Sequence, residues 1–390
     1  MIKSSKVTLK YLNTCKKDTL SVFLKEYRRV VSCFIDILWD MDDITPLLNK
    51  DITSKVDTWL SARMIQCAGK QASGIVRGTQ VKQKRRLYII EKLKDEGKFK
   101  KARKLYKIYD EISITKPNIN NVEPELDSRF VKIDLDNETS FDGWITLSSI
   151  GNKLKIKIPF KKHKHFNKLH SKGELNKGVR ISLNTVTFMF KLPDVELKDN
   201  TTKNVLGIDI GQTTVLSCSN GTTSFKNKHG HDLSSISDIL CRKKKGSKGF
   251  ERADKHRKNY INWTINNLDL TEFSQVNIEN IKNMRKGVRS SRRLSHWTYT
   301  DIFSKIESVC YEQGVLVKRI NPTYTSKRCN KCGYTRTNNR KGKLFKCGNC
   351  NYTADADLNA SMNIACELKP IWFKQRHKYD IKKGFFWKSD

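Results

Sequence analysis

The stretch from Cys329 to Asn363 constrains this chain more than any other part of its sequence. It contains two Cys-x-x-Cys pairs separated by fourteen residues, and Asp357 follows the last cysteine by seven residues. Tetrahedral Zn²⁺ takes four soft ligands, and each short pair can supply two of them from one tight turn. We therefore predict a zinc ribbon that holds one structural Zn²⁺. Its expected ligands are Cys329, Cys332, Cys347 and Cys350.

The alternatives to zinc are a pair of disulfides or four reduced thiols. Gly333 and Gly348 lie in the two turns, where a residue free of Cβ strain is expected. The chain has 11 cysteines, an odd number, and no apolar signal-peptide core, so we expect a reducing compartment in which disulfides are rare. The cysteines outside the ribbon are expected to be buried free thiols: Cys15, Cys33, Cys67, Cys218, Cys241, Cys310 and Cys366.

The charge of the chain points to its partners. Its 390 residues include 76 Lys and Arg against 40 Asp and Glu, a formal net charge of +36. Such an excess repels itself unless a polyanion neutralises it, which favours nucleic acid as the partner. A merely basic protein, or one that binds anionic membrane, is the alternative. No apolar run approaches a membrane span and no basic helix adjoins a lipidation site, so we expect a cytoplasmic, nucleoid-associated protein with no membrane partner.

The N-terminal part predicts one strand followed by helices. Residues 6–12 alternate apolar and polar side chains, as in a half-buried strand. Asp18 or Thr19 can cap a long helix whose apolar residues recur at three- and four-residue steps as far as Met41. A second helix is predicted over residues 56–76.

A basic helical hairpin is predicted over residues 80–112, with its turn at Gly97. Lys and Arg outnumber acids there, and tyrosines are interleaved with them. The surface is either a solvated helical face or a contact for RNA or DNA, and the charge of the whole chain favours the second. The cationic residues singled out in this segment are Lys84, Arg85 and Arg86.

Residues 131–135, 154–160 and 186–192 alternate apolar and polar side chains, as short antiparallel strands do. Such strands favour a small barrel, which the first strand of the chain would join. We expect an α+β multidomain protein whose β-barrel is built from two segments, residues 1–16 and 117–200. The helices of residues 17–116 would be an insertion into it.

A lysine-rich segment follows the strand of residues 154–160. It contains His163 and His165, and two histidines spaced two residues apart could suggest a metal site. No acid or thiol lies in this run, so a phosphate-facing loop is the better interpretation, with Lys161 and Lys162 as contacts.

Two carboxylates lie in strand-like segments upstream of the ribbon. Asp209 is the one charge in the apolar strand of residues 205–211, where a lone carboxylate is costly unless it is paired or metal-bound. Glycines flank it on its own face, which we expect to leave room for an ion and a phosphate. The strands that follow resemble the opening of a ribonuclease H-like sheet. Glu279 lies in a later strand, residues 275–281.

Asp357 begins the last predicted helix, whose Leu358, Met362 and Ala365 are expected to face inward. Brought together at one end of a sheet, Asp209, Glu279 and Asp357 would hold two Mg²⁺ or Mn²⁺ ions and hydrolyse a phosphodiester. Taken alone, Asp357 could be a helix cap and Glu279 a solvated residue at a strand end. The basic segment after Asp209 adds candidate nucleic-acid contacts at Arg242, Lys243, Lys244 and Lys245.

These motifs resemble the transposon-encoded TnpB (OrfB) proteins and the compact type V CRISPR effectors. The resemblance is strong over residues 205–366. It rests on Gly-Ile-Asp209-Ile-Gly, Asn-Ile-Glu279-Asn, Tyr324-Thr-Ser-Lys-Arg-Cys-Asn-Lys-Cys-Gly333, and Phe345-Lys-Cys-Gly-Asn-Cys with Ala356-Asp357-Leu-Asn-Ala-Ser-Met-Asn363. Asp355 adds an acid close to Asp357, and the family motif assigns the ligand to Asp357. Ser361 and Ile281 stand where the family commonly has alanine and leucine.

The resemblance implies an RNA-guided DNA endonuclease. A single RuvC-type nuclease domain, residues 201–325 and 354–368, would carry the three acids, with the zinc ribbon of residues 326–353 inserted in it. The barrel would be the wedge domain and the helical insertion the recognition part. Together they would bind guide RNA, double-stranded target DNA and a short flanking motif. The tail, residues 369–390, has no assigned role, and the protein is expected to be a monomer or homodimer.

Three other functions compete with this interpretation. The first is an RNA-guided DNA-binding protein that does not cut DNA. Loss of one of the three acids would favour this alternative, but all three are present. A guide-independent nuclease or resolvase would need less basic surface than the N-terminal half offers. A zinc-ribbon binding module, such as a transcription factor, would leave the apolar setting of Asp209 unexplained.

Overall fold

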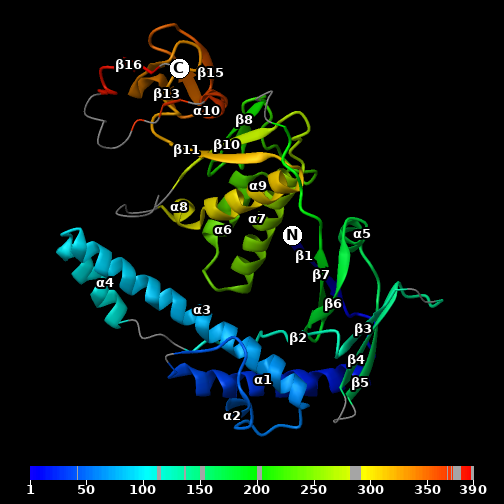
Figure 1. Ribbon diagram of the computed structural model, residues 1–390. Coiled ribbons are helices and arrows are strands. Elements are labelled where there is room, and N and C mark those ends of the chain that lie inside the picture. Colours follow the sequence, from blue (N-terminus) through cyan, green and yellow to red (C-terminus); the bar gives the residue numbers. More distant parts are fainter. Residues whose placement is uncertain are drawn as a thin grey trace. The chain divides into compact units, whose positions relative to one another are not determined.

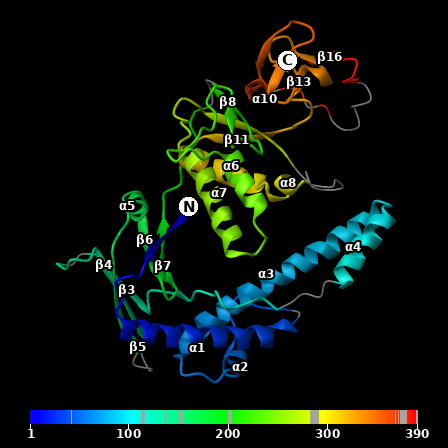
Figure 2. The same ribbon diagram turned by 180° about the vertical axis from the view of Figure 1, so that it is seen from behind.

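The computed structural model describes the chain except for residues 42, 112–115, 136–137, 150–153, 200–203, 282–290, 367, 370, 372–378 and 388–390. The chain divides into two units, Met1–Asp194 and Val195–Asp390. In the described ranges, no helix is both long enough and apolar enough to cross a membrane. Figures 1 and 2 show the elements of each unit from opposite sides.

Most of the described helical residues of the first unit lie in a segment before its second strand. The helices described there are α1 (Thr14–Trp39), α2 (Lys50–Thr53), α3 (Ala62–Asp95) and α4 (Phe99–Glu111). The long helices α1 and α3 pack side by side, and α4 folds back along α3 (Figure 1). The chain reverses at Gly97, whose φ of +68° suits glycine, so the predicted hairpin turn is confirmed.

The boundaries of these helices differ from the predicted ones. Helix α1 begins at Thr14 because the side chain of Asn13 caps it, accepting a bond of 3.1 Å from the Lys16 N–H; Asp18 and Thr19 lie inside the helix. The predicted helices over 56–76 and 80–97 are one continuous helix, α3. Gly78 and Thr79 at the expected break are weak helix formers, but a single glycine costs a helix only about 1 kcal/mol and no proline ends it there.

The strands of the first unit form two sheets. One has the order β1-β7-β6-β2 and the other β3-β4-β5. Strand β1 pairs antiparallel with β7, so the first strand does join the later ones as predicted. The strands among the described residues are β1 (Ile2–Thr8), β2 (Glu125–Leu126), β3 (Val131–Asp134), β4 (Gly143–Ser149), β5 (Leu154–Phe160), β6 (Glu174–Ile181) and β7 (Thr185–Lys191).

Both sheets contribute side chains to one hydrophobic core, together with α1 and α3. The closed barrel stays a prediction, since the described strands pair within two separate sheets. Strand β1 ends at Thr8 rather than at residue 12, because Leu12 already forms a turn with the carbonyl of Leu9. A short helix, α5 (Lys164–His170), follows β5.

The second unit is built on a sheet of order β11-β10-β8-β9. Its strands are β8 (Val205–Asp209), β9 (Ser217–Cys218), β10 (Gln275–Glu279) and β11 (Leu316–Ile320). Strand β10 runs parallel to both β8 and β11, and β9 runs antiparallel to β8. The helices are α6 (Leu233–Arg242), α7 (Lys248–Asn266), α8 (Arg292–His296), α9 (Tyr299–Glu312) and α10 (Ala356–Ala365). Helix α9 and strand β11 confirm the predicted elements at 299–313 and 315–320.

Helix α10 packs directly on β8 at Gly207. A Cβ at this position would lie 2.1 Å from the carbonyl oxygen of Ser361 and 2.4 Å from the backbone nitrogen of Ala365. The expectation that this glycine leaves room for an ion and a phosphate is therefore wrong. Its role is to let the helix approach the strand.

The cysteine-rich segment folds into small antiparallel sheets. Three strands, β13 (Arg340–Lys341), β14 (Leu344–Lys346) and β15 (Thr353–Asp355), form one sheet. The other sheet consists of β12 (Tyr334–Thr335) and β16 (Phe385–Phe386). A short 3₁₀ helix, Thr337–Asn339, follows β12 in the chain. The C-terminal tail thus adds a strand to the ribbon, a role that the sequence did not indicate. Trp372 and Phe373 of the tail lie outside the described residues.

Candidate metal centres and nucleic-acid contacts

Asp209 and Glu279 end two neighbouring parallel strands. Ile208 of β8 pairs with Ile278 of β10, so the two acids occupy equivalent positions at the carboxyl ends of these strands. Ligands of open α/β sheets bind outside this edge. Asp357 lies in the first turn of α10, which packs on β8 and β10.

Glu279 and Asp357 act electrostatically on Asp209. Burial raises the pKa of Asp209 well above its ordinary value, and the charges of Glu279 and Asp357 raise it further. The cations Arg340 and Lys343 oppose this shift. Burial also raises the pKa of Glu279, against the effects of a hydrogen bond from Thr325 and of Arg340. The fold therefore brings the three predicted acids into one electrostatic site.

Asp357 is buried, with 7% of its surface exposed, and two cations of the ribbon hold it. Arg340 Nη2 lies 2.8 Å from Asp357 Oδ1, and Lys343 Nζ pairs with Oδ2. Both cations come from the β13–β14 hairpin. Nothing in the spacing of these two cations in the sequence indicates a contact with the next helix.

The cap of α10 is Asp355. Its Oδ1 accepts hydrogen bonds of 2.9 Å from the Asp357 N–H and 3.0 Å from the Leu358 N–H. The alternative that Asp357 serves as the helix cap is therefore wrong, and its carboxylate pairs with Arg340 and Lys343 instead.

The buried face of α10 also differs from the predicted one. Leu358, Met362 and Ala365 are only half-buried. The helix instead buries Ala356, Asp357, Asn359, Ala360, Ser361, Asn363 and Ile364. Asn359 and Asn363, four residues apart on one face of the helix, were the signal in the sequence for this buried face. Buried amides need hydrogen-bond partners on a neighbouring segment.

The donor set of the carboxylate site fits hard divalent cations. All three candidate ligands offer oxygen, which Mg²⁺ and Mn²⁺ prefer. Two of them have pKa values raised by burial, and in Asp209 by like charge as well, so a cation at this position would offset both effects.

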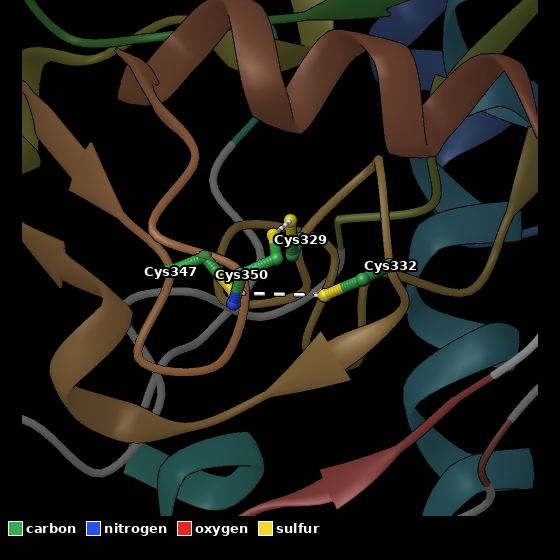
Figure 3. Close-up of side chains that lie close together, drawn as sticks. All are labelled: Cys329, Cys332, Cys347 and Cys350. Atoms are coloured by element: carbon green, nitrogen blue, oxygen red, sulfur yellow. Dashed lines mark hydrogen bonds between the residues drawn. The ribbon is translucent and has the colours of Figure 1, made fainter.

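The four ribbon cysteines form the second candidate centre (Figure 3). Their sulfur atoms all lie within 4.8 Å of one another. Cys329 Sγ is 3.7 Å from Cys350 Sγ, and Cys332 Sγ is 3.6 Å from Cys347 Sγ, so no disulfide joins them. Two backbone N–H groups, of Asn349 and Cys350, each donate to Cys347 Sγ over 3.4 Å. Four convergent thiols with such donors can hold a metal such as zinc.

The protonation of these thiols reflects their surroundings. Burial raises the pKa of Cys329 to about 12. For Cys332 burial is outweighed by hydrogen bonds from the Tyr334 backbone, the facing thiols and Asn349, which lower the pKa to about 7. Metal binding requires thiolates, so it would be coupled to release of protons from the more buried sulfurs.

The two knuckle turns differ in their backbone. Gly333 has a φ of +77°, as predicted for a turn that favours glycine. In the second knuckle the positive φ, +56°, belongs to Asn351, so the expectation for Gly348 is wrong. The cysteines outside the ribbon are free, but only Cys218 and Cys310 are buried, and Cys15 is exposed.

The predicted nucleic-acid contacts lie on the surface of both units. Lys84, Arg85 and Arg86 are exposed on α3, and Lys161 is exposed after β5. Lys162 is half-buried, and its N–H donates to Asp142 Oδ2 over 2.7 Å. In the second unit the predicted contacts are exposed as well: Arg242 at the end of α6, and Lys243, Lys244 and Lys245 after it.

His163 has a structural role. Its Nδ1 accepts a bond of 3.3 Å from the Phe166 N–H and so caps α5. This contact gives the histidine a role in the fold, and the phosphate-facing role of Lys161 and Lys162 stays a prediction.

Comparisons with known proteins match parts of the chain. A family model described as "Cas12f1-like, TNB domain" matches residues 299–364. The CRISPR-associated endodeoxyribonuclease Cas12f1 of Sulfoacidibacillus thermotolerans is 44% identical over 91 residues, which are 23% of this chain and 21% of that protein. The TnpB-like protein aq_aa05 of Aquifex aeolicus (strain VF5) is 33% identical over 104 residues, 24% of this chain and 34% of that protein.

The chain thus matches only about a fifth to a third of the length of these relatives. Among solved structures, a Cas12f1–sgRNA–target DNA complex aligns with 94% of this chain and 99% of that chain, at 16% identity and a TM-score of 0.46. The mini-RNA-guided endonuclease CRISPR-Cas phi3 aligns with 94% of this chain and 92% of its own, at 10% identity and a TM-score of 0.49. At TM-scores below 0.5 these likenesses do not establish a shared fold. Residues 299–364 thus match the family model of the Cas12f1-like TNB domain, and parts of the chain are similar in sequence to Cas12f1 and to TnpB-like proteins.

Proposed function

We propose that this protein is an RNA-guided DNA endonuclease with a single RuvC-type centre. The observation that carries the proposal is the convergence of Asp209, Glu279 and Asp357 from two parallel strand ends and a helix packed against them. Relatives that match about a quarter to a third of the chain are named endodeoxyribonucleases. A site of buried acids at the carboxyl edge of a sheet, in a chain of net charge +36, suits a polyanionic substrate.

Asp209, Glu279 and Asp357 would hold Mg²⁺ or Mn²⁺. When bound, such ions activate water and stabilise the leaving oxygen of a phosphodiester. The protein's own residues prepare the site. Thr325 donates a hydrogen bond to Glu279 Oε1 and thereby orients that carboxylate.

Arg340 and Lys343 supply positive charge next to Asp357. Burial and the neighbouring acids oppose the ionisation of Asp209, and the charges of these two cations favour it. We propose that the zinc ribbon, held by Cys329, Cys332, Cys347 and Cys350, keeps the hairpin with these two cations at the nuclease site.

The first unit would supply the binding surface for guide RNA and target DNA. In this proposal the sheets of residues 1–16 and 117–200 form the wedge, and residues 17–116 form the recognition part. The exposed cations of α3, with Tyr88 exposed among them, suit phosphate contacts and base stacking. Base pairing with the guide would then read the sequence of the target.

The test begins with expression of the protein together with its native flanking DNA. Sequencing of the RNA that copurifies is expected to show one discrete species with a constant part and a variable end. The purified complex is then given plasmids that carry a matching or a scrambled target next to a randomised flanking sequence. The proposal expects Mg²⁺-dependent cleavage of the matching plasmid alone. Equal cleavage of both plasmids would instead identify a guide-independent nuclease.

A further inference from the structure

Arg328 is a buried cation placed directly before the first ribbon cysteine. It is only 4% exposed. Its Nε donates to the carbonyl oxygen of Trp387 over 2.6 Å, and its Nη1 donates to Asn363 Oδ1 over 2.6 Å. The guanidinium therefore connects three segments that are far apart in the sequence: the first knuckle, helix α10 and the C-terminal tail.

The backbone of the same residue makes a second connection to α10. The carbonyl oxygen of Arg328 accepts hydrogen bonds of 2.8 Å from Asn359 Nδ2 and 2.7 Å from Asn363 Nδ2. These asparagines lie two and six residues after Asp357 in the same helix. The position of the helix that carries this acid is thus set by contacts with the knuckle.

The network continues to a second acid of the nuclease site. Asn363 Nδ2 also donates to the carbonyl oxygen of Thr325 over 2.9 Å. The hydroxyl of Thr325 donates in turn to Glu279. A chain of buried hydrogen bonds therefore leads from Arg328 to both Glu279 and the helix of Asp357, and such networks fix one arrangement of the segments they join.

In the part of the chain that the structure describes, no carboxylate pairs with the charge of Arg328. Among the described residues, the ion pairs do not include one to Arg328. A buried cation without a counter-charge is unfavourable. The next residue, Cys329, is one of the four thiols that can hold a metal, and a Zn²⁺ ion with four thiolates carries a net charge of −2. A loaded zinc centre would supply the missing negative charge.

We propose that Arg328 is a positioning residue that both neutralises the thiolate–zinc centre and ties it to the nuclease carboxylates. Its charge stabilises the four thiolates, and its hydrogen bonds to Asn363 and Trp387 transmit the state of the ribbon to α10 and the tail. The zinc part depends only on the ribbon. The link to the acids rests on the function proposed above.

The first experiment measures zinc affinity by competition with a chromophoric chelator, on full-length protein purified without nucleic acid. The variants are R328Q, which removes the charge, and R328K, which keeps the charge but loses the planar set of donors. Lys346→Gln is the matched control, because Lys346 also directly precedes a ribbon cysteine but is exposed. R328Q is expected to bind Zn²⁺ roughly 10- to 100-fold more weakly, as for other residues that support metal ligands.

R328K is expected to recover part of this loss, and Lys346→Gln to stay within about twofold of the unmodified protein. In cobalt-loaded protein, the thiolate-to-cobalt absorption should shift in R328Q and not in the control. Zinc affinity within about twofold of the unmodified protein in R328Q would overturn the proposal. Should R328Q not fold, unchanged affinity in R328K, together with an unchanged cobalt spectrum, would overturn it equally.

The second experiment measures the Mg²⁺ concentration that gives half-maximal DNA cleavage by the zinc-loaded protein with its guide. R328K is expected to raise it roughly 5-fold or more, while guide binding is unchanged. If cleavage by R328K depends on Mg²⁺ as cleavage by the unmodified protein does, the proposed link between Arg328 and the nuclease acids is wrong. If the unmodified protein does not cleave DNA, the proposed function fails, and the zinc measurement still decides the role of Arg328.

Discussion

Arg340 Nη2 lies 2.8 Å from Asp357 Oδ1, so a cation of the cysteine-rich ribbon contacts an acid of the candidate nuclease site. Lys343 of the same hairpin pairs with the other oxygen of Asp357. The ribbon is thus part of the acid site and not only a neighbour of it in the sequence.

Removing the two ribbon cations should shift the pH dependence of cleavage. Arg340 and Lys343 both lower the pKa of Asp209, so in the double variant R340Q/K343Q that pKa should rise further. A carboxylate that ionises at higher pH binds a divalent ion only at higher pH. The acidic limb of the pH–rate profile should therefore move upward, measured with Mg²⁺ in excess. K341Q, which removes an exposed charge from the same hairpin, is the control, and equal profiles in both variants would contradict the prediction.

Replacing Asp209 by asparagine should stabilise the protein when no divalent ion is added. Burial and the acids Glu279 and Asp357 raise its pKa above the ordinary value of 3.8. Between 3.8 and the raised value the native state binds more protons than the unfolded chain, so the free energy of unfolding falls as the pH rises through this window. In D209N the side chain at this position cannot ionise, so this fall in the free energy of unfolding does not occur.

Thermal unfolding of zinc-loaded protein at neutral pH measures this effect. D209N should have the higher Tm, by roughly 2–4 °C for each kcal/mol gained. Added Mg²⁺ should narrow the difference, because it binds the unmodified site and offsets the repulsion there. A lower Tm in D209N, or a difference that Mg²⁺ leaves unchanged, would contradict the account.

Replacing Gly207 by alanine should disrupt the contact between β8 and α10. The new Cβ would meet the backbone at Ser361 and Ala365, and backbone atoms cannot rotate away as a side chain can. We expect a loss of about 1–3 kcal/mol or more in the free energy of unfolding, measured with urea. A Cβ at Gly74 of α3 would meet no other segment within 4 Å, so G74A should instead stabilise its helix by about 0.5–1 kcal/mol. A tolerated G207A would show that the helix does not pack on the strand in this way.

Replacing Cys347 by serine should release the metal of the ribbon. The control is C366S, because Cys366 is a free, half-buried thiol outside the four-cysteine cluster. Elemental analysis of purified protein is expected to find zinc in the unmodified chain and in C366S, and to find it depleted in C347S. Zinc retained in C347S would contradict the assignment of the ribbon ligands.

Local patterns predicted the parts of this chain that depend on neighbouring residues. Alternation identified strands such as β5 and β7, and the positive φ of Gly97 fits the predicted hairpin turn. The motif order also placed Asp209, Glu279 and Asp357 on two strands and a helix that pack together.

Contacts between distant segments could not be predicted in this way. The partners of Arg328 are 35 and 59 residues away, and the pairing of β16 with β12 joins the tail to the ribbon. The inward face of α10 was misjudged for the same reason. An apolar stripe is the usual signal of burial, but here buried Asn359 and Asn363 find their partners on the knuckle.

The central claim is that Asp209, Glu279 and Asp357 form one centre that cuts DNA under the direction of a guide RNA. The most direct measurement compares guided plasmid cleavage by the unmodified complex with that of D209N, E279Q and D357N, each after quantifying the guide RNA bound. The account predicts that each variant binds the guide as the unmodified protein does and that each loses both strand cuts. A variant that binds the guide and still cuts the matching target would contradict it.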